Sequence, residues 1–305
     1  MNATAAPARV KGPLVWRDMD QQELDDAYDQ IVYASNRDLV VGRRVAASER
    51  ARAILGPPQR VAFGPSDFEQ LDIFRAPSPA SEGSEGAPVN VFVHGGAWRR
   101  NRAADYAAQA ELLIRAGAHA VLIDFINVDQ AHGDLLPMYE QVCRALAWAW
   151  RNADTFGGDR ERFYISAHSS GAHLAGCALT VGWRETGLPK NFCKGALLAS
   201  GMYDLAPVRL SKRSAYVKFT DAMVEKLSAQ RHLDGLHTPL ILSHGTCETP
   251  EFQRQSRDFA AAVRTAGKPA ELIVGDGYNH FEMLETLANP YGLLGRAMLR
   301  QMGLV

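Results

Sequence analysis

Ser169 stands where a sharp turn could expose a reactive hydroxyl. The sequence Ala167-His168-Ser169-Ser170-Gly171 follows a short apolar run and precedes a helix-like stretch of small residues. This is the context of a nucleophile elbow, a strained strand-to-helix turn that lifts a serine above the sheet. The usual pattern has glycine two residues before the serine, and here Ala167 takes that place. The motif favours a nucleophile, and a serine that only caps the following helix is the alternative.

A second motif, His94-Gly95-Gly96-Ala97-Trp98, ends an earlier apolar run. Acyl transfer places negative charge on an oxygen of the tetrahedral intermediate, and backbone N–H groups aimed at that oxygen stabilise it. A plain Gly-Gly turn beside a buried Trp is the alternative reading. Because the motif precedes a candidate elbow, we expect it to form an oxyanion hole. The residues expected to supply the N–H groups are Gly95, Gly96, Ala97 and Ser170.

A serine nucleophile also needs a histidine base and an acid that orients the imidazole. If the acid and the base follow the serine in that order, the base is His280, because no other histidine lies downstream of the candidate acid. Glu248 follows a predicted strand and is the expected acid. Glu251 and Asp276 are the alternatives, and Glu248 would then be a carboxylate of a surface loop. Cys247 is expected to pack rather than to attack, since no neighbouring base activates it.

The elements that must position these residues alternate along the chain. Apolar runs predict strands at 89–93, 120–125, 163–166, 195–199, 239–243 and 272–274, with two shorter strands within 60–76. Helical periodicity lies between them, and we also expect a helix over 20–36. This order predicts an α/β fold with a mostly parallel twisted sheet and helices on both faces. Ligands bind such sheets at the carboxyl ends of the strands, where the candidate residues lie.

Composition narrows the classes of partner. The 305 residues carry a net charge of −1, so there is no basic field for nucleic acid or an anionic membrane. The uncharged stretch 163–183 contains several His and Ser residues, which suits a buried strand and helix better than a membrane span. The first thirteen residues have no apolar run of the kind a secretory signal needs. Four scattered cysteines favour reduced thiols and a cytoplasmic location.

From about Leu71 to Leu287 the chain resembles the α/β-hydrolase superfamily, and within it the kynurenine formamidase (arylformamidase) branch. The resemblance rests on HGGAW at 94–98, AHSSGAHL at 167–174, SGMYDLAP at 200–207, ETPEFQRQS at 248–256 and NHFE at 279–282. The chain departs from the branch at Ala167, which replaces Gly, at Ser170, which replaces Ala, and at Glu248, which replaces Asp. The segment 125–130 also differs from the usual D-Y-x-x-A-P.

The resemblance implies an α/β-hydrolase fold with a small helical lid. We expect a flexible tail at 1–19 and a single domain at 20–305, with 20–36 and about 203–236 as cap elements over the strand ends. It further implies acyl transfer through an acyl-enzyme on Ser169, with neither a cofactor nor a metal. No H-E-x-x-H motif and no Gly-rich phosphate loop is present.

The expected substrate is a small molecule, an amide or ester that joins a small acyl group to an aromatic leaving group, as in N-formylkynurenine. A general carboxylesterase for short-chain esters and a non-catalytic ligand-binding homologue are the alternatives. Charged residues are sparse near the motifs, so we expect the buried part of the substrate to be apolar. No nucleic acid or membrane partner is expected, and a homodimer is left open. The residues expected to line the pocket are Trp98, Phe125, Tyr203 and Phe281.

Overall fold

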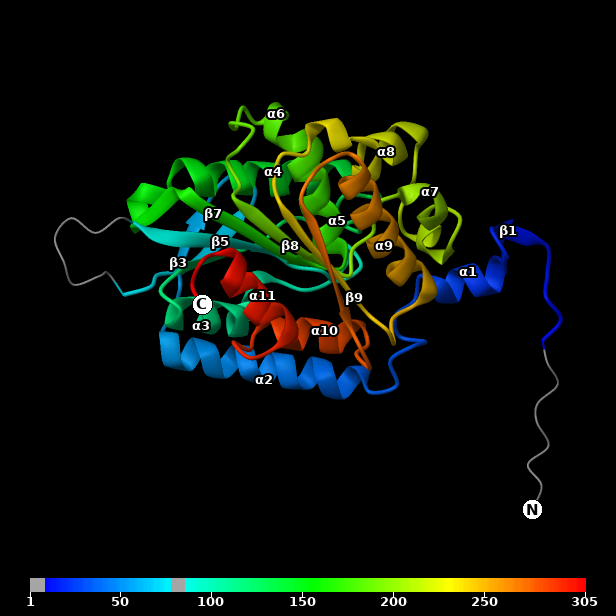
Figure 1. The fold of residues 1–305 in the computed structure, drawn as a ribbon, viewed down its shortest axis with the longest axis horizontal. Coiled ribbons are helices and arrows are strands. Elements are labelled where there is room, and N and C mark those ends of the chain that lie inside the picture. Colours follow the sequence, from blue (N-terminus) through cyan, green and yellow to red (C-terminus); the bar gives the residue numbers. More distant parts are fainter. Residues whose placement is uncertain (1–8, 78–85) are drawn as a thin grey trace, which may run out of the picture.

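A twisted sheet crosses the centre of the protein (Figure 1). The computed structural model describes residues 9–77 and 86–305. In spatial order the strands are β3 (Gln59–Ala62), β4 (Gln70–Phe74), β6 (His119–Ile123), β5 (Ala87–Val93), β7 (Gly158–His168), β8 (Gly195–Ala199), β9 (Leu240–Gly245) and β10 (Ala270–Gly275). β4 runs antiparallel to both of its neighbours, and the remaining pairs are parallel. The predicted mostly parallel sheet is confirmed.

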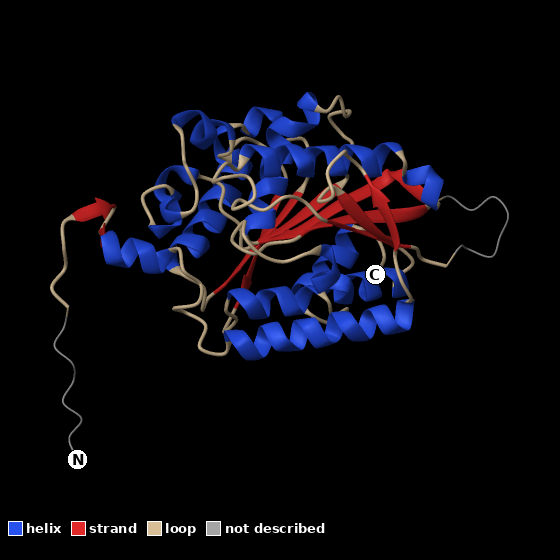
Figure 2. Ribbon diagram, turned by 180° about the vertical axis from the view of Figure 1, so that it is seen from behind, coloured by secondary structure: helices blue, strands red, loops and turns tan. Residues whose placement is uncertain are grey.

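Helices cover both faces of this sheet (Figures 1 and 2). Successive strand residues point to opposite faces, so Val91 and Val93 of β5 belong to one apolar core and Phe92 to the other. The first core packs under α4 (Leu136–Arg151), α5 (Ser170–Cys177) and α9 (Pro250–Thr265). The second packs under α3 (Ala107–Arg115), α10 (His280–Leu287) and α11 (Leu293–Gln301), with α2 (Arg37–Leu55) outside them. The parallel strands can be apolar throughout because both faces are covered.

The N-terminal part differs from the prediction. A short hairpin of β1 (Leu14–Trp16) and β2 (Met19–Asp20) leads into α1 (Gln21–Ala27). The helix predicted over 20–36 forms only in its first part, since α1 ends at Ala27 and the chain then turns so that Tyr28 and Gln30 reach the body of the protein. Residues 1–8 of the expected tail lie outside the described residues.

The 19-residue helix α2 was not predicted at all. Its sequence, RDLVVGRRVAASERARAIL, contains many apolar residues, but its buried residues are Val40, Ser48 and Ala51, whereas Leu39, Val45 and Ile54 are exposed. An amphipathic pattern needs apolar residues gathered on one face, and here they are spread around the helix. α2 packs mainly against α3 and α10 rather than against the sheet.

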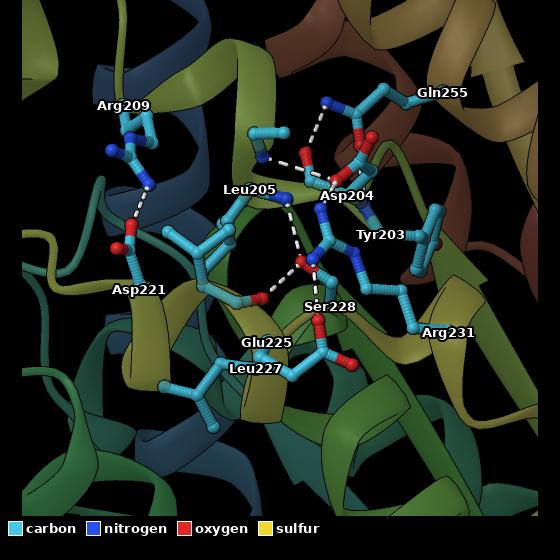
Figure 3. A network of polar contacts seen from close by, with 12 residues as sticks. Tyr203, Asp204, Leu205, Arg209, Asp221, Glu225, Leu227, Ser228, Arg231 and Gln255 are labelled. Carbon is cyan, nitrogen blue, oxygen red and sulfur yellow. Dashed lines mark hydrogen bonds and ion pairs between the residues drawn. The ribbon is translucent and has the colours of Figure 1, made fainter.

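The segment after β8 folds as a unit held by polar contacts (Figure 3). It contains α7 (Leu205–Val208) and α8 (Asp221–Lys226). Ser228 Oγ accepts from the Leu205 amide at 2.9 Å, and Arg231 pairs with Asp204 at 3.2 Å. Gln255 of α9 accepts from the Asp204 amide at 2.9 Å, which attaches the segment to the main body. The segment also buries apolar side chains such as Leu205, Val224 and Leu227 in the core, but they come from short helices and turns, so its sequence shows no long helical periodicity.

Candidate active site

Ser169 occupies a strained turn between β7 and α5. Its φ of 58° and ψ of −127° lie outside the regions that L-residues favour. The neighbouring backbones almost touch here, and this is possible because Gly171 has no side chain. A Cβ on Gly171 would lie 2.2 Å from the carbonyl oxygen of Val93. The geometry is that of a nucleophile elbow, in which the hydroxyl is presented above the strand ends.

His280 links Ser169 to Glu248 by hydrogen bonds. The Ser169 hydroxyl lies 2.9 Å from Nε2 of His280, and Nδ1 of the same ring lies 2.8 Å from Oε2 of Glu248. His280 is the first residue of α10, and Asn279 caps that helix in a reciprocal bond with Glu282. The cap fixes the direction in which the imidazole leaves the helix. The arrangement allows Nε2 to accept the serine proton while Nδ1–H donates to the carboxylate.

The carboxylate of Glu248 is fully buried, and both of its oxygens are bonded. Oε1 accepts from the Ser200 hydroxyl at 2.6 Å and from the Gly245 amide at 2.7 Å. Oε2 accepts from the Gln30 amide at 3.3 Å besides His280. Four donors satisfy the charged group, which offsets the cost of removing it from water. The longer Glu side chain therefore reaches the imidazole in a fixed position.

The two alternative acids lie elsewhere. Glu251 is buried and accepts from Arg254 at 2.6 and 2.7 Å and from the Tyr28 hydroxyl at 2.8 Å. This set ties the N-terminal segment to α9. Asp276 is exposed and bonds to the Thr246 hydroxyl at 3.3 Å. Of the three candidate acids, the structure brings Glu248 to His280.

The loop after β5 lies directly against the elbow. A Cβ on Gly95 would be 2.7 Å from the carbonyl oxygen of His168, so only glycine fits there. Gly96, Ala97 and Trp98 have φ of 122°, 55° and 62°, a run of left-handed residues that folds the loop back on itself. Gly96 and Ala97 line the same cavity as Ser169.

Ser170 connects this loop to the elbow. Its Oγ accepts from the Trp98 amide at 3.1 Å, so the Trp98 N–H is already in use. Ser170 also opens α5, where first-turn N–H groups have no partner within the helix. Of the four residues expected to form an oxyanion hole, the structure thus places Gly96 and Ala97 at the cavity beside Ser169, whereas Gly95 and Ser170 line a small hollow on the other side of the loop. Where the kynurenine formamidase branch has Ala, Ser170 thus adds a hydrogen bond between the loop after β5 and the start of α5.

His173 holds Trp98 from the other side. The indole Nε1–H of Trp98 donates to Nδ1 of His173 at 3.2 Å, and Nε2 of His173 lies 2.9 Å from the carbonyl oxygen of Leu227. The ring is therefore neutral, with its proton on Nε2. Burial lowers the pKa of His173 to about 4.

This pKa predicts a pH dependence of stability. Between about pH 6.5 and 4 the unfolded chain binds a proton at His173 that the folded chain does not, so stability falls as the pH falls through this window. We expect His173 to contribute about 2 kcal/mol to the loss of unfolding free energy between pH 7 and pH 5. His173→Gln, which retains a donor toward Leu227, should be less stable at pH 7 and should lose less on acidification. Urea unfolding at both pH values measures the difference, and equal losses in both proteins would contradict the prediction.

A cavity of about 320 Å³ opens in front of Ser169 and His280. Of the four expected pocket residues, Phe281 lines it. Trp98 and Phe125 line a separate hollow of about 10 Å³ behind the oxyanion loop, a space for one water molecule. Tyr203 is fully buried, and its ring stacks on Phe259 with centroids 4.2 Å apart. The structure thus places one of these four aromatic residues at the cavity.

The expectation of few charges near the site is wrong. The cavity is lined by Asp29 and by cationic side chains from α2, the oxyanion loop and the start of the cap, namely Arg37, Arg44, Arg99, Arg100, Lys212 and Arg213. Most of these lie in segments that the motifs do not include. Sequence reasoning also missed Ser200 and Gln30 as partners of Glu248. Ser200 stands inside the SGMYDLAP motif, which was the available signal, whereas Gln30 offered none.

Nothing in the described ranges provides a metal centre, because no group of three or more His, Cys, Asp or Glu side chains there is placed to hold an ion. Likewise, no helix within 9–77 and 86–305 is both long and apolar enough to cross a membrane.

Comparison with known proteins supports the same fold. The family model BD-FAE matches residues 71–192. A putative thioesterase structure from Silicibacter sp. tm1040 superposes with a TM-score of 0.73 at 20% identity, covering 88% of this chain and 96% of that one. The chain is an α/β-hydrolase by fold. This hydrolase is 27% identical over 303 residues to kynurenine formamidase of Danio rerio, covering 94% of its own length and 98% of the relative.

Esterases are also similar to this hydrolase. A probable isoprenylcysteine alpha-carbonyl methylesterase from Oryza sativa is 28% identical over 219 residues, which is 64% of this chain and 51% of that protein. Relatives of both kinds are named for cleaving an amide or an ester, and both reactions use the same catalytic groups. The expected resemblance to the kynurenine formamidase branch is confirmed.

Proposed function

We propose that the protein is a serine hydrolase that removes a small acyl group from an aromatic amine, as in N-formylkynurenine. The observation that carries the proposal is the bonded series from Glu248 through His280 to Ser169, placed beside the oxyanion loop and open to one cavity. The similarity to kynurenine formamidase along almost its entire length supports the choice of substrate. A non-catalytic binding role is disfavoured because each catalytic group is present and bonded.

The reaction would run in two steps. Ser169 Oγ attacks the carbonyl carbon while its proton passes to Nε2 of His280, and the new oxyanion accepts bonds from backbone N–H groups of the Gly95–Ala97 loop and Ser170. The C–N bond then breaks, and His280 gives the proton to the leaving amine. A water molecule, deprotonated by His280, attacks the acyl-enzyme and releases the carboxylic acid and free Ser169. Glu248 stabilises the imidazolium in both steps.

A general carboxylesterase for short-chain esters is the second candidate. The esterase relatives support it, and esters are chemically easier to cleave than amides with the same groups. Comparison of turnover of N-formylkynurenine with that of p-nitrophenyl esters separates the two candidates. A kcat/KM for N-formylkynurenine at or above that for p-nitrophenyl acetate supports the formamidase, and turnover of esters alone supports the esterase.

Acyl length provides a further prediction. One cavity of about 320 Å³ must hold both the acyl and the leaving group, so an aromatic leaving group leaves room for a short acyl chain only. We expect kcat/KM for p-nitrophenyl esters to fall at least ~10-fold from acetyl to octanoyl. The initial rates of the C2 to C8 series measure this. A kcat/KM that rises steadily to eight or more acyl carbons would contradict the prediction and indicate a lipase-like esterase.

Segments 20–36 and 203–236 are proposed as cap elements of a single catalytic domain. Tyr28, Gln30 and Tyr216 support this, since they contribute to the wall of the cavity from those two segments. A cytoplasmic location is also proposed, because all four cysteines are free and three of them are buried. A homodimer remains a proposal that size-exclusion chromatography with light scattering would test.

A further inference from the structure

The cationic side chains around the cavity are not equivalent, because several are neutralised by nearby carboxylates. Lys212 pairs with Asp29. Arg99 pairs with Asp129 at 2.8 Å, and Arg37 with Asp38 at 2.5 Å. In such exposed pairs the two charges largely cancel, so the pair attracts a further charge only weakly.

Arg213 differs from all of these because it is buried, with 6% of its surface exposed. Nη1 donates to the Tyr216 hydroxyl and Nη2 to the carbonyl oxygen of Tyr28, both at 2.9 Å. Its Nε has no partner, and no carboxylate in the described ranges forms an ion pair with it. Its guanidinium carbon lies 5.3 Å from the Trp98 ring centre and 5.8 Å from that of Phe252. Neutral oxygens and aromatic faces alone therefore balance a buried positive charge.

A buried charge without a counter-ion is costly. Cation–π contacts and two neutral acceptors offset only part of that cost. A carboxylate in the cavity would supply the missing counter-charge, since a guanidinium binds carboxylates by short, charge-assisted hydrogen bonds. Nη1 and Nη2 each make one of the bonds given above and each have a second N–H, so a carboxylate in the cavity that Arg213 lines could accept from them.

Arg213 lies close to the catalytic groups. The Trp98 ring that it faces belongs to the oxyanion loop, and the Phe252 ring lies 5.1 Å from the ring of His280. Both of its hydrogen-bond partners, Tyr28 and Tyr216, line the cavity, as Arg213 itself does. A molecule whose carbonyl reaches Ser169 therefore shares this cavity with the guanidinium.

Arg44 of α2 adds a second charge of the same kind. Its guanidinium lies 4.7 Å from the Tyr106 ring centre and donates to the Tyr106 hydroxyl at 3.2 Å, while its Nε is buried without a partner. Like Arg213, it lines the cavity and forms no ion pair in the described ranges. Arg213 and Arg44, together with the exposed Arg100, which also forms no ion pair in the described ranges, thus give the cavity a net positive field.

We propose that Arg213, with Arg44 contributing to the field, binds the carboxylate of the substrate's leaving group and sets the specificity. The inference rests on the proposed function, in that the acyl group reacts at Ser169 and the carboxylate belongs to the aromatic leaving group. In N-formylkynurenine this carboxylate belongs to the amino-acid group of the leaving arylamine. Uncharged anilides and simple aryl esters lack the group that Arg213 binds.

The test compares N-formylkynurenine with its carboxamide, in which a neutral amide replaces the carboxylate. Dissociation constants are measured by calorimetry on Ser169→Ala protein, so that neither compound is consumed. We expect the acid to bind at least ~10-fold more tightly than the carboxamide, the size of one charge-assisted contact. In Ser169→Ala combined with Arg213→Gln, that preference should fall to within about threefold, while affinity for the carboxamide changes little.

Arg209→Gln is the matched control. Arg209 lies in the same cap segment but outside the cavity, where it pairs with exposed Asp221 at 2.6 Å (Figure 3). The control should retain the preference for the acid. Thermal unfolding of each variant shows whether loss of the Tyr28 and Tyr216 contacts has unfolded the cap, and Arg213→Lys, which retains the charge, should keep part of the preference if it has not.

Equal affinity for acid and carboxamide, or a preference that survives Arg213→Gln, would overturn the inference. Turnover by the wild-type enzyme decides the proposed function separately. If N-formylkynurenine is hydrolysed and the carboxamide is hydrolysed equally well, the formamidase proposal stands and the role of Arg213 fails. If neither is hydrolysed, the proposed function fails, and the ratio of the two affinities still decides whether Arg213 selects a carboxylate.

Discussion

Ser169→Ala is expected to lower kcat by at least ~10³-fold against any substrate that the enzyme cleaves. The hydroxyl bonded to Nε2 of His280 is the only nucleophile in this arrangement, and alanine leaves the imidazole with no proton to accept. The free energy of unfolding should change by less than ~1 kcal/mol, because the change removes one hydrogen bond and leaves the fold of the turn in place. Steady-state kinetics and urea unfolding measure the two effects.

Ser170→Ala is the matched control for that change. It removes a neighbouring hydroxyl that bonds the Trp98 amide but takes no part in proton transfer. Its effect on kcat should be far smaller than that of Ser169→Ala. A Ser169→Ala enzyme that retains more than about a tenth of the wild-type rate would mean that another group attacks the substrate.

Glu248→Gln is expected to cost about 10³–10⁴-fold in kcat. Ser200 and Gly245 both donate to Oε1, so the glutamine must turn its carbonyl toward them and its NH₂ toward His280. Nδ1 of His280 then has to accept a bond, which forces the proton onto Nε2. That nitrogen can no longer accept the proton of Ser169. The loss thus arises from the wrong tautomer rather than from a change in shape.

Asp276→Asn is the control for Glu248→Gln, because Asp276 is exposed and bonds to Thr246 rather than to the imidazole. It should leave kcat unchanged. Glu251→Gln should lower stability, since it leaves the buried side of Arg254 without its carboxylate. A nearly silent Glu248→Gln together with a crippling Asp276→Asn or Glu251→Gln would show that the acid had been assigned to the wrong residue.

Most strands and the parallel character of the sheet could be predicted because the parallel strands contain apolar runs followed by turn residues, although β7 begins at Gly158, five residues before the predicted run at 163–166. β5, for example, is buried along its whole length and ends at a glycine pair. The positions of Ser169, Glu248 and His280 followed from the same pattern, since each lies just beyond a strand end. Local sequence determines both features, so reading along the chain was sufficient.

The walls of the cavity could not be predicted in this way. Arg44 lies on a helix whose apolar residues are spread around it and mark no buried face, and Arg213 lies in a segment without periodicity. Gln30 reaches Glu248 across 218 residues of chain. Such contacts depend on how distant segments pack together, and single-sequence patterns contain no information about that. Tyr203, which pattern alone favoured for the pocket, instead packs into the core against α9.

The contacts of the N-terminal segment affect how the protein is made. Tyr28 and Gln30 leave the ribosome early, yet their partners Glu251 and Glu248 lie 223 and 218 residues later in the chain. At usual rates of synthesis this separation lasts roughly 10–40 s. During that interval Tyr28 and Gln30 lack these partners, so one wall of the cavity is completed only after β9 and the start of α9 have been made. The first part of the chain to be synthesised is thus among the last to reach its native place.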